Sequence, residues 1–248
     1  MIVYLSLGGN PTIDVITTIA PPEKINVLTS FQYKNNLKGY KPRQFKNFMA
    51  DSGAFTAMNA GKKIDDNYID QYIKWINEND IQNFVEMDLD EIIGYEDVLK
   101  LRKKIEIQTG KKPIPVWHNV RGEDGWRQMC YEYPYVAISL SLMTNTSKWL
   151  KQYDYEPLDW FMTEARKAGA KVHALGCNNL QLMEKYRFYS ADSSTHTSGR
   201  RFGSIIGIKN GKVGNIRPKN GLKLDFEKAE IFNTKQMLEI MKYAEQKL

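Results

Sequence analysis

Two aspartates stand at the ends of apolar segments of this chain. Asp51 closes FMAD and is followed by Ser-Gly, and Asp192 closes FYSAD and is followed by Ser-Ser. Each could simply form an Asx turn or a helix N-cap. Two carboxylates across one pocket can instead cleave a glycosidic bond, because one attacks the anomeric carbon while the other moves protons. We therefore take Asp51 and Asp192 as candidate catalytic residues.

A third group of acids lies in the segment 83–89 and just after it. Acidic and apolar residues alternate there, which is typical of a strand with two different faces. The apolar members are Val85, Met87 and Leu89, and the acidic members are Glu86, Asp88 and Asp90. We expect the apolar side chains to face covering helices and the acids to point inward. Asp90 is then best placed to meet a ligand, whereas Glu86 and Asp88 are equally well explained by pairing with lysine or arginine.

The three histidines offer an alternative chemistry. His118, His173 and His196 all fall at or near the ends of expected strands. With an aspartate they could bind a divalent metal and make a hydrolase. No close pair such as H-x-H occurs, so hydrogen bonds to a substrate or to nearby acids are the preferred interpretation.

The elements that must position these residues alternate along the chain. Short apolar runs predict eight strands, at 2–7, 26–30, 47–51, 83–89, 114–118, 135–140, 171–175 and 187–192. Asn10-Pro11 predicts the start of a helix at about 11–19, and apolar spacing of three to four predicts helices at 65–79 and 95–109. Further helices are expected at 122–132, 157–168 and 178–185. The segment 33–46 is the weakest candidate for a helix.

This alternation predicts an α/β fold, a closed (β/α)8 TIM barrel with a C-terminal β-hairpin and helix. Asn210-Gly211 between apolar runs predicts the hairpin at 204–216, and the last helix is expected at 234–247. We expect one domain over 1–248, with 204–248 appended to the barrel. Active sites of such barrels lie where the strands end, which is where Asp51 and Asp192 fall.

Composition narrows the class of protein. The chain has 248 residues, 42% of them hydrophobic, with a formal charge of +6 and a pI near 9.0. This composition supports a buried core, and the charge favours an anionic partner such as nucleic acid. No secretory signal and no apolar run of bilayer length is evident, so we expect a cytoplasmic protein. Cys130 and Cys177 are expected to be small buried residues.

Several motifs together resemble one family. DSGAFT at 51–56 resembles the DSGGFQ motif of the tRNA-guanine transglycosylase superfamily. Four further segments that resemble that family follow in the same order: MDLDE at 87–91, VAISLSL at 136–142, HALGCNN at 173–179 and SADSSTHTSGRRFG at 190–203. Members that act on tRNA are longer and carry a zinc site of three cysteines and a histidine, which two cysteines cannot supply. The compact form without this zinc site, with DSGAFT and DSSTHTSGRRFG, is most similar to phage-type DNA-guanine transglycosylases, which replace guanine in DNA with a 7-deazaguanine base.

The resemblance implies roles for individual residues. Asp192 would be the nucleophile, Asp51 the general acid/base, and Asp90 the acceptor for the guanine edge. The other implied contacts are Phe55 and Leu175 against the base, Ser52, Asn119, Ser139 and Leu140 at its edge, His196 at the sugar or phosphate, and Arg200 and Arg201 at phosphates. The expected partners are guanine-containing DNA and a free 7-deazaguanine such as preQ0, and no cofactor or zinc is expected.

Three alternatives stay open at this point. The same chemistry could act on tRNA. A metal-dependent barrel hydrolase would use the histidines. A nucleic-acid-binding barrel without catalysis would keep the fold and the basic charge but would have no need of both aspartates.

Overall fold

The computed structural model describes residues 1–8, 12–59, 61, 63–141, 144–209, 212–217 and 225–248. Its strands are β1 (Ile2–Leu7), β2 (Asn26–Ser30), β3 (Asn47–Asp51), β4 (Val116–Trp117), β5 (Tyr135–Ser139), β6 (Lys171–Leu175), β7 (Ser190–Ser193), β8 (Ile205–Lys209) and β9 (Lys212–Ile216). Its α-helices are α1 (Thr12–Ile19), α2 (Ala54–Asn59), α3 (Asp66–Glu78), α4 (Asp90–Ile93), α5 (Tyr95–Thr109), α6 (Gly122–Glu132), α7 (Asn145–Gln152), α8 (Pro157–Ala168), α9 (Leu180–Tyr186), α10 (Ser198–Phe202) and α11 (Phe226–Lys247).

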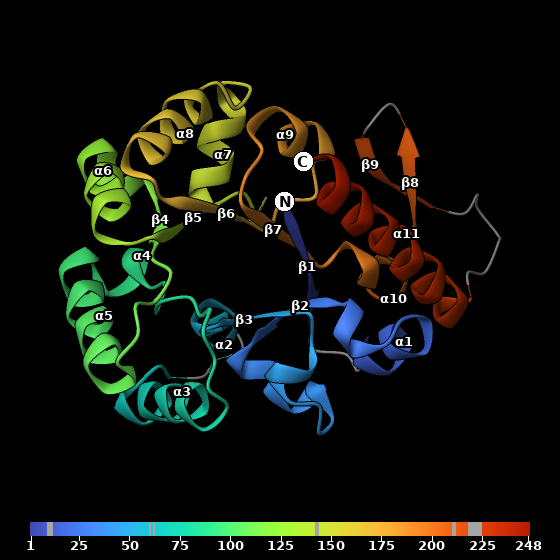
Figure 1. Ribbon diagram of the computed structural model, residues 1–248, viewed down its shortest axis with the longest axis horizontal. Helices are drawn as coiled ribbons and strands as arrows, with labels where there is room; N and C mark the ends of the chain where they lie inside the picture. The colour runs from blue at the N-terminus through green and yellow to red at the C-terminus, as the bar shows by residue number, and fades with distance from the viewer. Residues whose placement is uncertain (9–11, 60, 62, 142–143, 210–211, 218–224) are drawn as a thin grey trace.

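Seven strands form one parallel sheet in the order β3-β2-β1-β7-β6-β5-β4. The sheet curls, and the helices surround it (Figure 1). The order places β1, the first strand, directly beside β7, the last strand of this sheet. The α/β class is therefore confirmed, as a curled half-barrel sheet with helices. Five 3₁₀ segments complete the described elements: Pro22–Lys24, Phe31–Leu37, Pro42–Gln44, Asn119–Arg121 and Thr195–Thr197.

The prediction of a regular strand at 83–89 is wrong. Two isolated parallel bridges stand in its place, Ala50 with Phe84 and Val85 with Ile114, between the edge strands β3 and β4. The cause is the side chain of Glu86, whose Oε1 accepts the backbone N–H of Val116 at 2.7 Å. An amide that could extend a backbone ladder is thus bonded to a carboxylate instead.

The expectation that Val85, Met87 and Leu89 all face the helices is also wrong. Val85 belongs to a small apolar cluster on the inner side of the sheet, whereas Met87 and Leu89 belong to the large cluster that includes the helices. Glu86 is fully buried and pairs with Arg102 of α5 and with Arg121. The pairing of Glu86 with arginine, one of the two open interpretations, is therefore confirmed.

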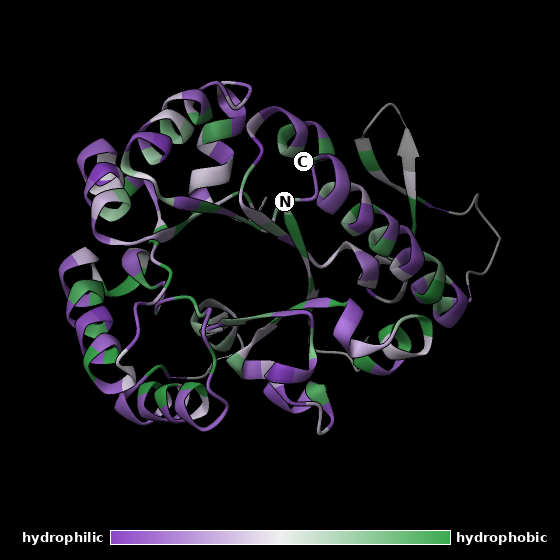
Figure 2. Cartoon of the chain, viewed as in Figure 1, coloured by the Kyte–Doolittle hydropathy of each residue, from purple (hydrophilic) through white to green (hydrophobic). Residues whose placement is uncertain are grey.

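Two apolar clusters define the inner and outer sides of the sheet. The inner cluster contains no helix residue, so it occupies the side that the helices do not cover; its buried members are Tyr4, Leu28, Met49, Val85, Ile114, Val116 and Ala137. The outer cluster joins strand residues such as Val3 and Val136 to helix residues such as Tyr72 and Trp126. Hydrophobic and hydrophilic residues alternate along the surrounding helices (Figure 2), as amphipathic packing requires.

The C-terminal part contains the expected hairpin and a longer helix than predicted. Strands β8 and β9 pair in antiparallel fashion, while the predicted turn residues Asn210 and Gly211 lie outside the described residues. Helix α11 begins at Phe226 rather than 234, because its first turns bury polar residues that apolar periodicity does not detect. Asn233 of α11 accepts the N–H of Ile206 at 2.7 Å and donates to the hydroxyl of Ser198 at 3.1 Å, which fixes α11 to both segments. In the described part of the chain, no helix is long and apolar enough to cross a membrane.

The buried Glu86 gives a test of this fold. Glu86→Gln keeps the shape and an oxygen for Val116 but leaves Arg102 without its buried charge partner. We expect the free energy of unfolding in urea to fall by about 3–5 kcal/mol. The exposed Glu96→Gln on the same helix as Arg102 is the control, and it should change stability by less than about 0.5 kcal/mol. A Glu86→Gln protein as stable as the wild type would contradict this description.

Candidate active site

Asp51 and Asp192 both point to the inner side of the sheet. Asp51 is the last residue of β3 and follows Met49 of the inner cluster by two positions. Asp192 in β7 stands beside Tyr4 of β1, which also belongs to that cluster. Since side chains two apart in a strand share a face, both carboxyls lie above the inner apolar layer, toward the strand C-termini.

The Asp192 carboxylate is held by neighbours on both sides. Its side chain is buried, and Oδ2 accepts a hydrogen bond from the Ser6 hydroxyl of β1. Oδ1 accepts the backbone N–H of Gly176 at 2.6 Å. The ring Nε2 of His173 lies 3.3 Å from the same oxygen. The two hydrogen bonds from Ser6 and Gly176 fix the orientation of the carboxylate.

Asp51 has a different electrostatic environment. Burial, followed by the negative charges of Asp88 and Asp192, raises its pKa to about 7, although backbone N–H groups of Gly53 and Ser52 oppose the change. The carboxyl can therefore both give and take a proton near neutral pH. Asp51 is the last residue of β3 and Asp192 stands one residue before the end of β7, so both acids lie at the C-terminal end of the sheet.

The glycine two residues after Asp51 is required by a close approach of the backbone to β2. Gly53 has a φ of +68°, and a Cβ there would stand 2.1 Å from the Ser30 hydroxyl oxygen. A side chain is excluded on both grounds. The sharp turn of the DSG segment thus lets the backbone fold against β2 and keeps its N–H groups directed at the Asp51 carboxyl.

The arrangement of Asp88 and Asp90 differs from the expectation. Asp90 is buried, and its two oxygens accept hydrogen bonds from Nε and Nη2 of Arg121, each at 2.6 Å. The carboxylate expected to bind a guanine edge is therefore already engaged by a buried guanidinium. Asp88 is only half-buried, contacts Nε2 of His118, and acts electrostatically on Asp51. Asp88 is thus the acid of this segment that stands next to the candidate catalytic pair.

A candidate cation position exists beside these acids. One ligand atom each from Asp88, Asp90 and His118 lies within 4.8 Å of the others. Arg121, however, already supplies a positive charge to Asp90 and pairs with Glu86 as well. The three histidines do not meet at this point, since His173 lies beside Asp192 and His196 is buried in the 3₁₀ segment Thr195–Thr197.

Most of the other residues that were expected to contact the base lie at the C-terminal ends of the strands. Ser52 and Ser139 are buried at the ends of β3 and β5, and Leu140 follows β5 with its N–H donated to Leu175 O. Leu175 ends β6 and packs against the inner cluster. Asn119 is exposed just after β4.

The segment after Asp192 is arranged differently from the expectation. His196 is fully buried, which lowers its pKa to about 4, so the ring is neutral and offers no surface to a sugar or phosphate. Arg201 is exposed and donates to the Ser194 hydroxyl at 3.4 Å. The side chains of Phe55 and Arg200 lie outside the described part of the structure.

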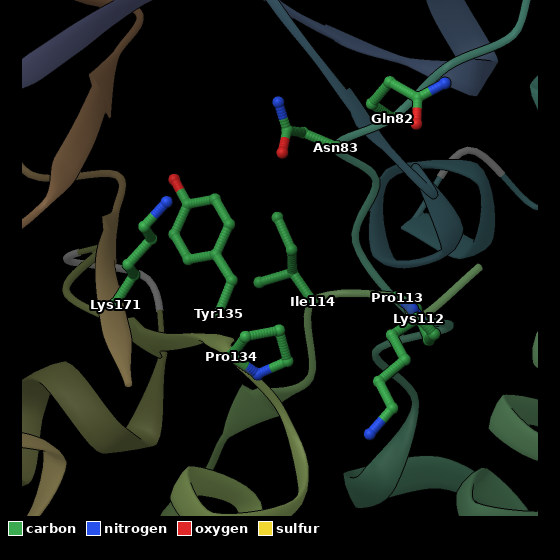
Figure 3. Close-up of a pocket in the computed structure, with 8 residues that line it drawn as sticks. All are labelled: Gln82, Asn83, Lys112, Pro113, Ile114, Pro134, Tyr135 and Lys171. Atoms are coloured by element: carbon green, nitrogen blue, oxygen red, sulfur yellow. The ribbon is translucent and has the colours of Figure 1, made fainter. Parts of the chain in front are cut away.

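A small cavity of about 190 Å³ lies at the opposite end of the strands (Figure 3). Its lining residues precede β4, β5 and β6 or begin them: Gln82, Asn83, Lys112, Pro113, Ile114, Pro134, Tyr135 and Lys171. Because the acids stand at the C-terminal ends, this cavity is separate from the candidate active site.

One residue around the site was missed from the sequence: Ser6, whose hydroxyl donates to Asp192. His173 lies beside Asp192 and His118 beside Asp88, in line with the expectation that the histidines contact nearby acids. A signal for Ser6 was present, since the closed barrel expected from the sequence brings its first and last strands together. His173 and Leu175 share a face by their spacing, so the same argument would have placed His173 below the ligand position.

Comparison of this chain with protein-family models, with curated proteins and with solved structures finds no match. The function of this protein must therefore be inferred from its sequence motifs and from the geometry of the acids and their neighbours.

The raised pKa of Asp51 predicts a dependence of stability on pH. Folding favours the protonated form, so this group contributes stability below its unfolded pKa of ~4 that is lost as pH rises toward the folded pKa of about 7. Asp51→Asn removes this dependence. We compare the free energy of unfolding of the variant with that of the wild type at each pH. From pH 4.5 to pH 8 this difference should shift in favour of the variant by roughly 1–3 kcal/mol. The shift is smaller than the full pKa change implies, because the carboxyl is half-buried.

Urea unfolding at the two pH values measures this difference. Asp124→Asn on α6 is the control, because its side chain is 99% exposed, and it should show the wild-type difference. An Asp51→Asn protein with the same difference as Asp124→Asn would show that Asp51 does not have this environment.

Proposed function

We propose that this protein is a pentosyltransferase that replaces guanine in DNA with a 7-deazaguanine base. The single observation that carries the proposal is the pair formed by Asp51 and Asp192. The two carboxyls come from distant segments to one end of the sheet, where one is held by donors and the other has a pKa of about 7. A base exchange through a covalent sugar intermediate requires this division between a nucleophile and a proton carrier.

The first half-reaction breaks the bond between the sugar and guanine. A carboxylate oxygen of Asp192 attacks C1′, the C1′–N bond breaks, and its electron pair leaves with the base. Protonated Asp51 gives its proton to the departing guanine. Ser6 and Gly176 hold the Asp192 carboxylate in place for this attack.

The second half-reaction restores the enzyme. The ionised Asp51 takes the proton from the ring nitrogen of the incoming 7-deazaguanine. That nitrogen then attacks C1′, and the bond between C1′ and Asp192 breaks, which regenerates the free carboxylate. No net proton is consumed, because the proton that Asp51 takes from the incoming base replaces the one that it gave to guanine.

Asp88 is the residue that we propose for the edge of the base. A carboxylate accepts hydrogen bonds only, which suits the N1–H and amino group of guanine. Asp90 has both oxygens bonded to Arg121, whereas Asp88 is more accessible and acts on Asp51. The resemblance assigns this role to Asp90, and we propose Asp88 in its place.

The scaffold that we propose is a closed eight-stranded barrel in one domain. The seven-stranded sheet has β3 and β4 as its edges, and the segment around Phe84 and Val85 is bridged to the chain at both edges. A barrel of this kind brings Asp51 and Asp192 to one mouth. A base inside a DNA duplex is out of reach there, so the nucleotide must be flipped out or met in a single strand.

A metal-dependent hydrolase is the second candidate, because Asp88, Asp90 and His118 lie together. The guanidinium of Arg121 supports the first proposal over this one, since it already neutralises Asp90. A tRNA substrate would use the same two aspartates, and only a direct test distinguishes it.

Base exchange is tested with labelled guanine. We expect the wild-type protein to incorporate label into DNA and not into tRNA, with or without EDTA. Asp51→Asn and Asp192→Asn should each lower the rate by at least ~1,000-fold. The exposed Asp124→Asn is the matched control and should keep the wild-type rate.

Each other outcome rejects a defined part of the proposal. Label in tRNA but not in DNA rejects the substrate. Loss of exchange in EDTA supports the metal-dependent alternative. Exchange that survives both aspartate substitutions rejects the mechanism, and failure of the wild type on all substrates rejects the function.

A further inference from the structure

A chain of polar groups crosses the inside of the sheet below Asp192. The Tyr135 hydroxyl of β5 is hydrogen-bonded to the Ser190 hydroxyl of β7, and that oxygen lies 2.5 Å from Nδ1 of His173 in β6. Nε2 of the same ring lies 3.3 Å from Oδ1 of Asp192. These contacts connect the candidate nucleophile to Tyr135, which lines the cavity at the other end of the strands (Figure 3).

The members of this polar chain are placed by strand register. His173 stands opposite Ser190 in the β6–β7 pair, and Ser190 and Asp192 are two residues apart on β7. Tyr135 of β5 stands opposite Lys171, two residues before His173 on β6. The side chains of Tyr135, His173, Ser190 and Asp192 therefore all project to the inner side of the sheet. His173 and Ser190 are fully buried. Buried polar groups at such positions are costly unless they are paired, so the pairing is a built feature rather than a chance surface contact.

The donors and acceptors of the polar chain select one tautomer of His173. Burial raises the pKa of the Tyr135 hydroxyl above its usual range, so it keeps its proton and can donate to Ser190. Ser190 can then donate its single proton to Nδ1. A neutral imidazole that accepts at Nδ1 must carry its proton on Nε2, the atom that faces Asp192. Among the described residues, Nε2 has no partner with full hydrogen-bond geometry, and Asp192 Oδ1 is within reach.

We propose that His173 is a positioning residue for Asp192, with its Nε2–H tautomer fixed by Ser190 and Tyr135. This role rests on the proposed function, in which Asp192 attacks the sugar. An Nε2–H that lies 3.3 Å from Oδ1 of Asp192 orients the carboxylate for its attack on the sugar.

The arrangement of the polar chain is tested without any substrate. Protein labelled with ¹⁵N-histidine is examined by NMR, and His173→Gln assigns the signal of this ring. We expect the wild type to show a neutral ring protonated at Nε2 near pH 7. Ser190→Ala removes the donor to Nδ1 and should produce a mixture of the two tautomers.

Tyr189→Phe provides the matched control for this measurement. The Tyr189 ring packs edge-on against Tyr135 at a centroid distance of 5.2 Å and is not part of the polar chain. The variant should keep the wild-type tautomer. A wild-type ring protonated at Nδ1, or a Ser190→Ala spectrum identical to that of the wild type, would overturn the assignment.

Kinetics of guanine exchange test the positioning role. His173→Ala should lower kcat by about 10- to 100-fold with little change in KM, because a misplaced nucleophile slows chemistry rather than binding. His173→Gln should recover much of the loss, since its side-chain amide can donate to Asp192. An active wild-type enzyme whose kcat is unchanged by His173→Ala overturns the role. If the wild type exchanges no base, the proposed function fails, while the NMR result still decides the tautomer.

Discussion

The repulsion between carboxylates at one end of a parallel sheet is the constraint on which the rest of this structure depends. Asp88 and Asp192 both act on Asp51, and like charges in a partly dry site cannot all be ionised at low cost. The protein resolves this by giving each acid a different environment. Asp192 has Ser6, Gly176 and His173 around it, Asp88 has His118, and Asp51 has a raised pKa.

The layers below and beside these acids keep that arrangement fixed. The inner apolar cluster supports Asp51 from below, and the polar chain from His173 to Tyr135 supports Asp192. Beside them, Glu86, Asp90, Arg102 and Arg121 form a buried ionic group in which opposite charges are paired. Within this group, Glu86 accepts the backbone N–H of Val116. This bond explains why the segment between β3 and β4 forms isolated bridges and no regular strand.

The sequence predicted most of the elements because their signals are local. Helices such as α3 and α8 agree with their periodic patterns, and the strand that ends at Asp51 agrees with its short apolar run. The strand predicted at 187–192 is present as β7, but it begins at Ser190 and ends at Ser193. What failed depended on contacts distant in sequence. Asp90 is paired with Arg121, which is 31 residues away in the sequence, and no rule of residue spacing predicts this contact. The regular strand at 83–89 failed for the same reason, since the amide that Glu86 binds belongs to β4. The start of α11 was misplaced because Asn233 and its neighbours are buried polar residues.

A titration of the Asp51 carboxyl tests the shared electrostatic site most directly. Carbon-13 NMR of labelled aspartate would follow this carboxyl in the wild type and in Asp192→Asn and Asp88→Asn. The account predicts a pKa near 7 in the wild type and a lower value in each variant, because each substitution removes a negative neighbour. A wild-type pKa of about 4 that neither substitution changes would contradict it, since the two catalytic carboxyls would then not share one site.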